Sequence, residues 1–350
     1  MEILVLEEES CIDDLLPFTS TRSVLDIRMG IFTFREKWAL MLGDDSFVLG
    51  DGPALPANVL PTLKLAAAFY DEQLEGPLDQ EAIDRILPYA QIIRYPWHIF
   101  QHNAEALIED FSIIKARAIS QPIPSSVQAI CPAKIFIEKG ARLQHCLLNA
   151  STGPIYIGRN AEIMEGSLIR GPFACCEGAT VKMGTKIYGA TTLGPYSVAG
   201  GEIKNTVIFG YSNKGHDGYL GDAVIGEWCN IGAGTSASNL KNNAGEITVY
   251  HPASETYLSV GQKCGLLMGD YSRAAINTTF HTGTVAGVCC NIFGSGAPPK
   301  YIPDFSWGLE NPTRYEWDKA LRDIAGWKKL KNQSLTDAEI LALKHIFEQS

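Results

Sequence analysis

The feature that most constrains this sequence is an apolar residue that recurs every six positions. From Ile157 the register holds for seven members, and a second register, four places later, carries small residues in every case but Phe173. The apolar members are Ile157, Ile163, Ile169, Cys175, Val181, Ile187 and Leu193, and the second set is Ala161, Ser167, Phe173, Ala179, Thr185, Thr191 and Ser197. Both registers return at Ile225 and again from Met268 to Ile292. A period of six is neither helical nor that of a simple hairpin.

A strand of four or five residues and a turn fill one such hexad, so three hexads close a triangular coil that stacks on the next. We therefore predict a mainly β fold, a left-handed parallel β-helix of hexapeptide repeats, with a small N-terminal α/β domain and C-terminal helices. A β-sandwich is the alternative, but its strands would not keep one spacing for seven periods.

The sequence divides into four predicted segments. Residues 1–102 form the α/β domain, 103–130 a linker helix and loop, 131–296 the β-helix, and 297–350 a helical tail. The linker helix is expected over Asn103–Arg117 with Asn103 as its N-cap. In the tail, helices are expected from Arg314 to Leu330 and from about Thr336, which has capping-box spacing with Glu339.

Charge and composition exclude several classes of protein. The net charge of -10 argues against general affinity for nucleic acid or an anionic membrane. The N-terminus has no basic segment before its apolar run, and no stretch approaches twenty apolar residues, which favours a cytoplasmic location. The nine cysteines show no CxxC pair or zinc spacing. We expect reduced, buried thiols and no metal site.

The repeat breaks between Gly200 and Gly221, in a segment that contains Glu202, Lys204, His216, Asp217 and Tyr219. Function in a solenoid tends to lie where its coils are interrupted. A histidine titrates near neutral pH and can accept the proton of an attacking amine, which makes His216 the candidate general base. An idle surface histidine is the alternative.

The neighbouring segment from Gly221 to Asn243 adds the amides of Asn230 and Asn239 and the ammonium group of Lys241. Such groups suit the hydroxyls and the charge of a sugar phosphate. Asparagine also favours turns for local reasons, which is the alternative explanation of these residues.

At these residues the chain resembles the acetyltransferase half of the bifunctional N-acetylglucosamine-1-phosphate uridyltransferases and their archaeal relatives. It resembles more closely the sugar-nucleotidyltransferase-like proteins of Bacteroidetes that share the β-helix. The resemblance runs from about Pro122 to Gly308. Its densest stretches are GPIYIGRNAEIMEGSLIRGPFA, GGEIKN, GHDGYLGDAVIGEWCNIGAGT and GLLMGDYSRAAINTTFHTGTVAG.

This resemblance implies roles for individual residues. His216 occupies the position of the catalytic base, and the Ala233 backbone, with Gly232 beside it, lies near the acetyl group of acetyl-CoA. The implied substrate-binding residues are Lys204, Tyr219, Asn230 and Asn239. Lys241, Glu202 and Arg170 are further substrate-binding candidates from the residues themselves. A homotrimer is implied, with acetyl-CoA bound between adjacent β-helices.

Two departures concern the substrate. Cys175, Cys176 and Glu177 stand where the uridyltransferases carry a phosphate-binding arginine after GPFA, and Arg170 and Lys186 are the expected substitutes. Leu240 stands where that family has a tyrosine.

The segment from Leu15 to Trp38 resembles the first part of the nucleotidyltransferase-like domain of these proteins. In this chain the domain is about half the usual length. Nucleotidyl transfer needs a glycine-rich loop for the triphosphate and acidic residues for Mg²⁺. Residues 7–14 are instead acidic, and only Arg22 and Asp51 remain as candidates. Mg²⁺ is expected only if this domain is active.

The sequence thus predicts an acetyl-CoA-dependent N-acetyltransferase for an amino-sugar phosphate, similar to glucosamine 1-phosphate, or for a nucleotide sugar. The alternatives are a sugar-1-phosphate nucleotidyltransferase and a non-catalytic trimeric scaffold that binds sugar nucleotides. A zinc hydratase of the same architecture would need three histidines, and His216 and His281 lack the required close pairing.

Overall fold

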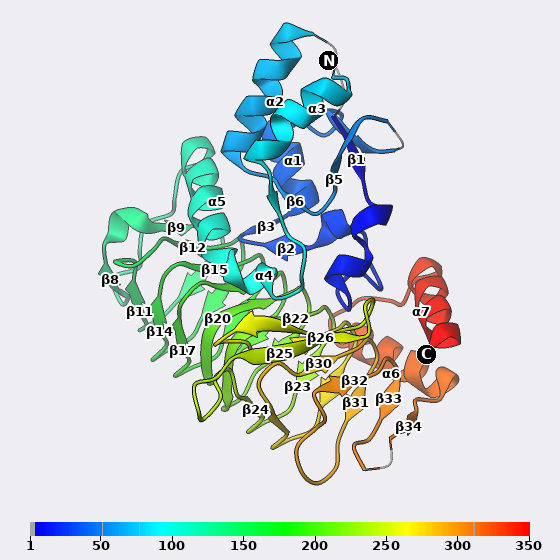
Figure 1. Ribbon diagram of the computed structural model, residues 1–350. Coiled ribbons are helices and arrows are strands. Elements are labelled where there is room, and N and C mark those ends of the chain that lie inside the picture. Colours follow the sequence, from blue (N-terminus) through cyan, green and yellow to red (C-terminus); the bar gives the residue numbers. More distant parts are fainter. Residues whose placement is uncertain (1–3, 51, 77, 311) are drawn as a thin grey trace.

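A parallel β-helix forms the body of the protein in the computed structural model, which describes residues 4–50, 52–76, 78–310 and 312–350. Figure 1 shows an N-terminal α/β unit on one side of the β-helix and the C-terminal helices beside its later coils. The predicted fold class is confirmed. None of the helices in these described ranges is long and apolar enough to cross a membrane.

The strands of the β-helix form three faces. Face A comprises β8 (Gln128–Ile130), β11 (Leu147–Asn149), β14 (Leu168–Arg170), β17 (Lys186–Tyr188), β24 (Ser236–Ala237) and β29 (Thr279–Phe280). Face B comprises β9 (Ile135–Ile137), β12 (Ile155–Ile157), β15 (Phe173–Cys175), β18 (Thr191–Leu193), β27 (Leu267–Met268), β30 (Val285–Ala286) and β32 (Tyr301–Ile302). Face C comprises β10 (Arg142–Leu143), β13 (Glu162–Ile163), β16 (Thr180–Val181), β19 (Val198–Ala199), β21 (Asn213–Lys214), β23 (Asn230–Ile231), β28 (Arg273–Ala274), β31 (Asn291–Ile292), β33 (Ser306–Trp307) and the antiparallel β34 (Thr313–Arg314). Two longer strands, β20 (Glu202–Ile208) and β22 (Tyr219–Ile225), run from face A around a corner into face B.

The six-residue period places one apolar residue on the inner side of each face in turn. Ile163 pairs with Val181 on face C, Ile169 with Ile187 on face A, and Cys175 with Leu193 on face B. All six side chains are buried in one core. Stacking of like positions therefore builds the hydrophobic interior coil by coil.

The β-helix continues through the segment where the period is lost. Thr180 pairs with Val198 eighteen residues later, whereas Val198 pairs with Asn213 only fifteen residues later. The break between Gly200 and Gly221 is thus a shortened coil rather than an inserted loop.

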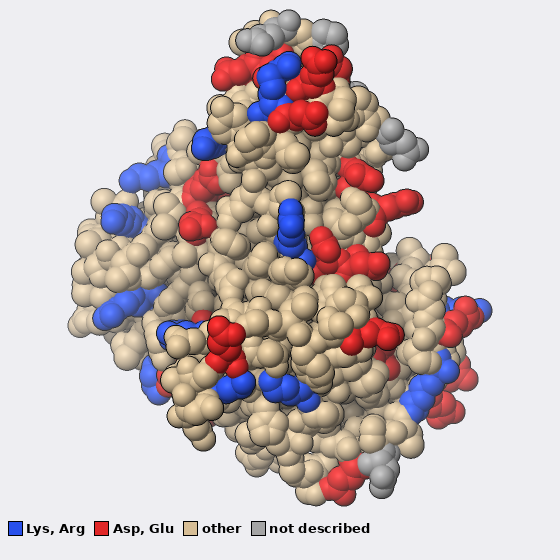
Figure 2. All heavy atoms as spheres, viewed as in Figure 1, with Lys and Arg blue, Asp and Glu red and all other residues tan. Residues whose placement is uncertain are grey.

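The N-terminal unit contains a parallel sheet with β1 (Leu4–Glu7) between β4 (Phe47–Leu49) and β5 (Ala54–Pro56). Two small antiparallel pairs accompany it, β2 (Arg28–Met29) with β3 (Phe32–Thr33) and β6 (Val59–Leu60) with β7 (Gln91–Ile92). Its helices are α1 (Phe34–Leu42), α2 (Leu63–Glu75) and α3 (Gln80–Ile86), followed by α4 (His98–Gln101) and α5 (Asn103–Arg117). Figure 2 shows Asp and Glu gathered over this unit, while Lys and Arg are scattered over the visible face.

The linker helix α5 matches its expected range, but Asn103 is not its N-cap. His102 takes that position, and Asn103 is fully buried at the junction of the two parts of the molecule. Its side chain accepts a hydrogen bond from the Gly30 amide at 2.7 Å and donates to the Ala190 carbonyl at 3.1 Å. The Asn103 side chain therefore connects the two parts of the molecule by tertiary hydrogen bonds and does not cap the helix.

Face B and the corner between faces B and C are covered by other elements. A hairpin of β25 (Ile247–His251) and β26 (Thr256–Gly261) is inserted between β24 and β27 and packs with the N-terminal unit. The helices α6 (Trp317–Lys329) and α7 (Asp337–Gln349) pack on the corner between faces B and C. The predicted capping box of Thr336 and Glu339 is confirmed. Face A instead keeps exposed apolar side chains such as Leu168, which is 50% exposed.

Candidate functional site

His216 lies at the corner between faces C and A, in the turn of residues 215–218 that joins β21 to β22. Its side chain is exposed. The turn that contains Gly232 and Ala233 stacks against it, and the Gly234 amide donates to the Asp217 carbonyl at 3.0 Å. The structure therefore brings the His216 turn next to the turn of Gly232 and Ala233.

The turn that stacks on the other side of His216 is two residues shorter. Val181 and Lys186 are separated by four residues at this corner, but Ala199 and Glu202 only by Gly200 and Gly201. Gly201 has a φ of +75°, and a Cβ there would lie 2.8 Å from the carbonyl oxygens of His216 and Gly218. Glycine is required here because the backbone of the His216 turn packs directly against it.

A buried lysine supports the same turn. Lys214 takes the inward position between Ala199 and Ile231 on face C, where the other coils place an apolar residue, and it is 1% exposed. Its ammonium group donates to the carbonyls of Gly200, at 3.1 Å, and His216. Burial lowers the pKa of Lys214 to about 8. Sequence reasoning missed this residue, because Lys214 is outside the six-residue registers of Ile157 and Ile225 and becomes inward-facing only through the shortened coil.

Face A gathers several of the predicted substrate-binding residues. Glu202 pairs in register with Lys186 and Tyr219, while Lys204 pairs with Tyr188. The Tyr188 hydroxyl donates to Glu202 at 2.7 Å, and this carboxylate raises the pKa of Tyr188 to about 12. The ammonium group of Lys204 is half-buried and has no hydrogen-bond or ion-pair partner within the described ranges. A half-buried cation without a partner is suited to bind an anionic ligand.

The corner between faces A and B is fixed by a carboxylate between two amides. The Asp222 side chain is buried and accepts from Asn205 at 2.7 Å and from Asn239. Burial raises the pKa of Tyr219, and the Asn239 side chain offsets part of this rise. Lys241 is turned away from this group, since its ammonium donates to the Glu246 carbonyl. Asp222 and Tyr188 are therefore site residues that the sequence reasoning did not single out.

A groove of about 660 Å³ extends along face A from these residues toward the N-terminal coils. Arg170 and Lys186 line it together with Tyr188 and Glu202, while Leu168 and Pro172 form part of its apolar wall. The two cations expected to replace the missing arginine thus lie in one groove with Glu202.

Two predicted residues lie elsewhere. Asn230 is on face C, in register with Asn213 and Arg273, and not on face A with Tyr219. Arg22 is buried at the junction, where it pairs with Asp270 and, at 3.3 Å, with Glu227. Burial alone would lower the pKa of Arg22, but the two carboxylates outweigh this and raise it. Asp51 lies outside the described residues.

The cysteines and metal-binding groups can be described for the same ranges. All nine cysteines are free; eight are buried as expected, and Cys131 is exposed. No cluster of three or more His, Cys, Asp or Glu side chains that could hold a metal ion occurs among the described residues.

Comparison with known proteins gives partial matches. Residues 3–50 match a family described as sugar nucleotidyl transferase. The chain is 32% identical over 152 residues to the bifunctional sugar-1-phosphate nucleotidylyltransferase/acetyltransferase of Sulfurisphaera tokodaii, covering 40% of this chain and 35% of that protein. It is 37% identical over 161 residues to the bifunctional protein GlmU of Nitratidesulfovibrio vulgaris strain DP4, covering 39% and 35%. A third relative, the bifunctional protein GlmU of Methanocaldococcus jannaschii, is 34% identical over 94 residues, covering 27% and 22%.

The chain spans about a fifth to two fifths of the length of the curated relatives it matches. Among solved structures, the UDP-N-acetylglucosamine acyltransferase of Francisella novicida has a TM-score of 0.34 at 13% identity, covering 65% of this chain and 84% of that one. The polySia-specific acetyltransferase NeuO has a TM-score of 0.29 at 11% identity, covering 55% and 86%. The assignment of the fold rests on the strand pairing described above rather than on these scores.

Proposed function

We propose that this chain is an acetyl-CoA-dependent N-acetyltransferase for an amino-sugar phosphate or a nucleotide sugar, with His216 as the general base. The observation that carries the proposal is the position of His216, exposed on a turn that stacks between a glycine turn and the Ala233 turn, three residues before Tyr219 on face A. The similarity to proteins named as bifunctional nucleotidylyltransferase/acetyltransferases supports the reaction class.

Acetyl-CoA would supply an acetyl group activated as a thioester. His216 would accept the proton of the substrate amine as the new amide bond forms and the thioester C–S bond breaks. The imidazolium would then give this proton to the departing thiolate, and CoA leaves as the free thiol. The Ala233 amide has no acceptor among the described residues, so it is available to donate to the acetyl carbonyl oxygen. Lys204, with Arg170 and Lys186 in the groove, would hold the phosphate, and Tyr219 with Asn239 would contact the sugar.

A homotrimer is part of this proposal. Met183 and Ile276 lie at the same corner of the β-helix as His216 and are 70% and 69% exposed. A neighbouring subunit packed along this corner would bury these side chains and enclose the site. The nine free thiols are consistent with a cytoplasmic location.

The test measures acetyl transfer from acetyl-CoA to a panel of amino-sugar phosphates and nucleotide sugars, and the release of the free thiol of CoA is the readout. His216→Ala should lower kcat by roughly 10²-fold or more, in keeping with loss of a general base. His281→Ala, which also removes an exposed imidazole from the β-helix, is the matched control and should keep full activity. Undiminished turnover in His216→Ala would sink the assignment.

Nucleotidyl transfer is the second candidate, favoured by the match of residues 3–50. Burial of Arg22 in ion pairs and the acidic segment after β1 argue against a triphosphate site there. Mg²⁺-dependent release of pyrophosphate from a nucleoside triphosphate and a sugar 1-phosphate would establish this activity.

A further inference from the structure

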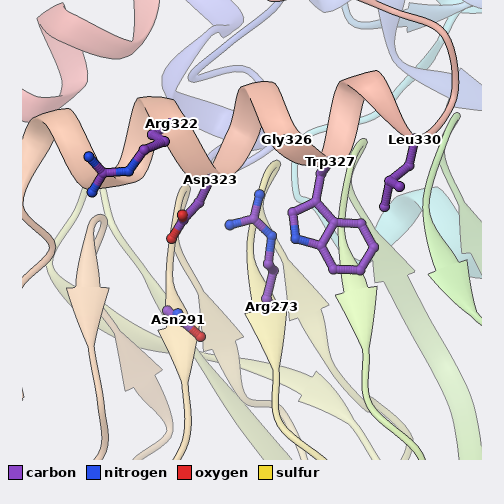
Figure 3. A pocket seen from close by; sticks show the side chains of 7 residues that line it. All are labelled: Arg273, Asn291, Arg322, Asp323, Gly326, Trp327 and Leu330. Carbon is purple, nitrogen blue, oxygen red and sulfur yellow. The ribbon is translucent and has the colours of Figure 1, made fainter.

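A second cavity lies between α6 and face C, away from the groove on face A. It has a volume of about 280 Å³. Figure 3 shows Arg273 rising from β28 into the space below α6, with Asp323 on one side of its guanidinium and Trp327 on the other. Arg322 and Gly326 of α6 and Asn291 of β31 also line it.

Arg273 is the unusual member of this lining. It is only 8% exposed, and its Nε and Nη2 atoms are buried without a hydrogen-bond partner. These two N–H groups lie on the same edge of the guanidinium, the fork that binds a carboxylate or phosphate with two parallel bonds. Because a buried charged donor is costly to leave unpaired, we expect a bound ligand to supply a hydrogen-bond acceptor here.

The one carboxylate in the cavity is already engaged. Asp323 accepts a hydrogen bond from the Tyr315 hydroxyl. Neither Arg273 nor the exposed Arg322 forms an ion pair with any residue in the described ranges. Two arginines and one satisfied carboxylate leave the cavity with an excess of positive charge.

The middle of α6 leaves the cavity open. Gly326 stands in the helix interior, where glycine is less favourable than alanine. A Cβ at this position would meet nothing within 4 Å, so close packing does not explain the glycine. Absence of a side chain here keeps the space above Arg273 free.

We propose that this cavity binds the phosphate group of a small metabolite. The fork of Arg273 would hold two phosphate oxygens, and Arg322 at the rim would supply the second positive charge. Trp327 lies beside the guanidinium, with its ring centroid 5.6 Å from Cζ, and the proposal requires it to shift so that the anion can reach the buried edge. The site is separate from the one proposed for acetyl transfer, because none of its residues lies on face A.

Inorganic phosphate is the probe, and thermal unfolding of the full chain is the first measurement. Sodium phosphate should raise Tm saturably above sodium chloride at equal ionic strength, because a ligand of the native state stabilises it. Arg273→Gln should reduce the shift, leaving only the part that arises from the phosphate-binding residues proposed on face A. Arg142→Gln, which removes an exposed arginine from the same face, should retain it.

Because Arg273→Gln could itself alter folding, Arg322→Gln provides a second variant at an exposed position. It should weaken phosphate binding several-fold in a titration followed by tryptophan fluorescence, and Trp327→Phe should remove that signal. Malonate in place of phosphate distinguishes a general oxyanion site from a phosphate site. His216→Ala and Lys204→Gln should bind phosphate here unchanged, so failure of the acetyltransferase proposal would leave this one intact. An equal Tm shift in the wild type and Arg273→Gln, or no shift at matched ionic strength, would overturn it.

Discussion

Lys214 shows how a single side chain can connect the core of a β-helix to its surface chemistry. Its stem occupies an apolar position in the interior, and its ammonium group binds the carbonyl of the residue proposed as the base. Burial disfavours the charged form of this lysine, yet two carbonyl oxygens give that form acceptors. The residue therefore positions the His216 turn without reaching the reacting atoms.

The lowered pKa of Lys214 predicts a pH-dependent contribution to stability. Between about pH 8 and the ordinary lysine pKa of 10.5 the unfolded chain binds more protons at this site than the folded chain. Stability should therefore rise with pH across this window, by about 3 kcal/mol at most. The measurement is the free energy of unfolding of wild type and Lys214→Met from pH 7 to 10.5.

The difference between these two proteins isolates the lysine from other groups that titrate in the same range. Lys186→Met, which removes an exposed ammonium group from face A, gives the baseline. A difference between wild type and Lys214→Met that stays constant over the window would contradict the prediction.

The coils of the β-helix differ from one another mainly in the turns between their strands. The apolar register predicted the β-helix and its three faces, because stacking of like side chains is a periodic property that a sequence displays directly. It could not predict that the break in the period is a two-residue turn, or that Asn230 and Tyr219 lie on different faces. Those depend on how many residues each corner holds, and a change in one corner moves every later residue to a new position.

The short turn of Gly200 and Gly201 offers a matched pair of substitutions. Gly201 and Gly184 are at the same corner with φ values of +75° and +70°, but only at Gly201 would an added Cβ meet backbone atoms within 4 Å. Alanine at Gly184 should cost about 1 kcal/mol of unfolding free energy through backbone strain alone. Alanine at Gly201 should cost about 1–3 kcal/mol more, because the His216 turn must shift.

Acetyl transfer should fall in Gly201→Ala and remain in Gly184→Ala. Chemical denaturation measures the unfolding free energies of the two variants, and thiol release from acetyl-CoA measures their acetyl transfer. Equal costs for the two substitutions would show that the His216 turn is not packed against Gly201 as described.

The elements that pack on the β-helix cover only one side of it. Helices and the inserted hairpin pack on face B and on the corner between faces B and C, whereas face A and its corner with face C keep exposed apolar side chains. The candidate site lies on the uncovered side. A subunit alone therefore presents an open surface where the proposed chemistry requires exclusion of water.

We expect the protein to have three times its chain mass of 38.2 kDa in solution. Ile276→Lys should dissociate the assembly, because it places a charge on an exposed apolar residue at the uncovered corner. Sedimentation equilibrium measures the mass, and acetyl transfer should fall with it. Leu341→Lys, at a residue of α7 that is 71% exposed, is the control and should leave the mass unchanged. A monomeric wild-type protein with full activity would refute this expectation.

The shared core of the N-terminal unit and face B has a consequence for synthesis on the ribosome. Phe18 packs on Phe209 at a centroid distance of 5.5 Å, and Thr21 and Arg22 bind Asp270, some 250 residues later in the chain. The N-terminal unit leaves the ribosome before the β-helix, yet part of its hydrophobic core is made of residues from Val207 to Val285. It must therefore wait for most of the β-helix before its own folding can be completed.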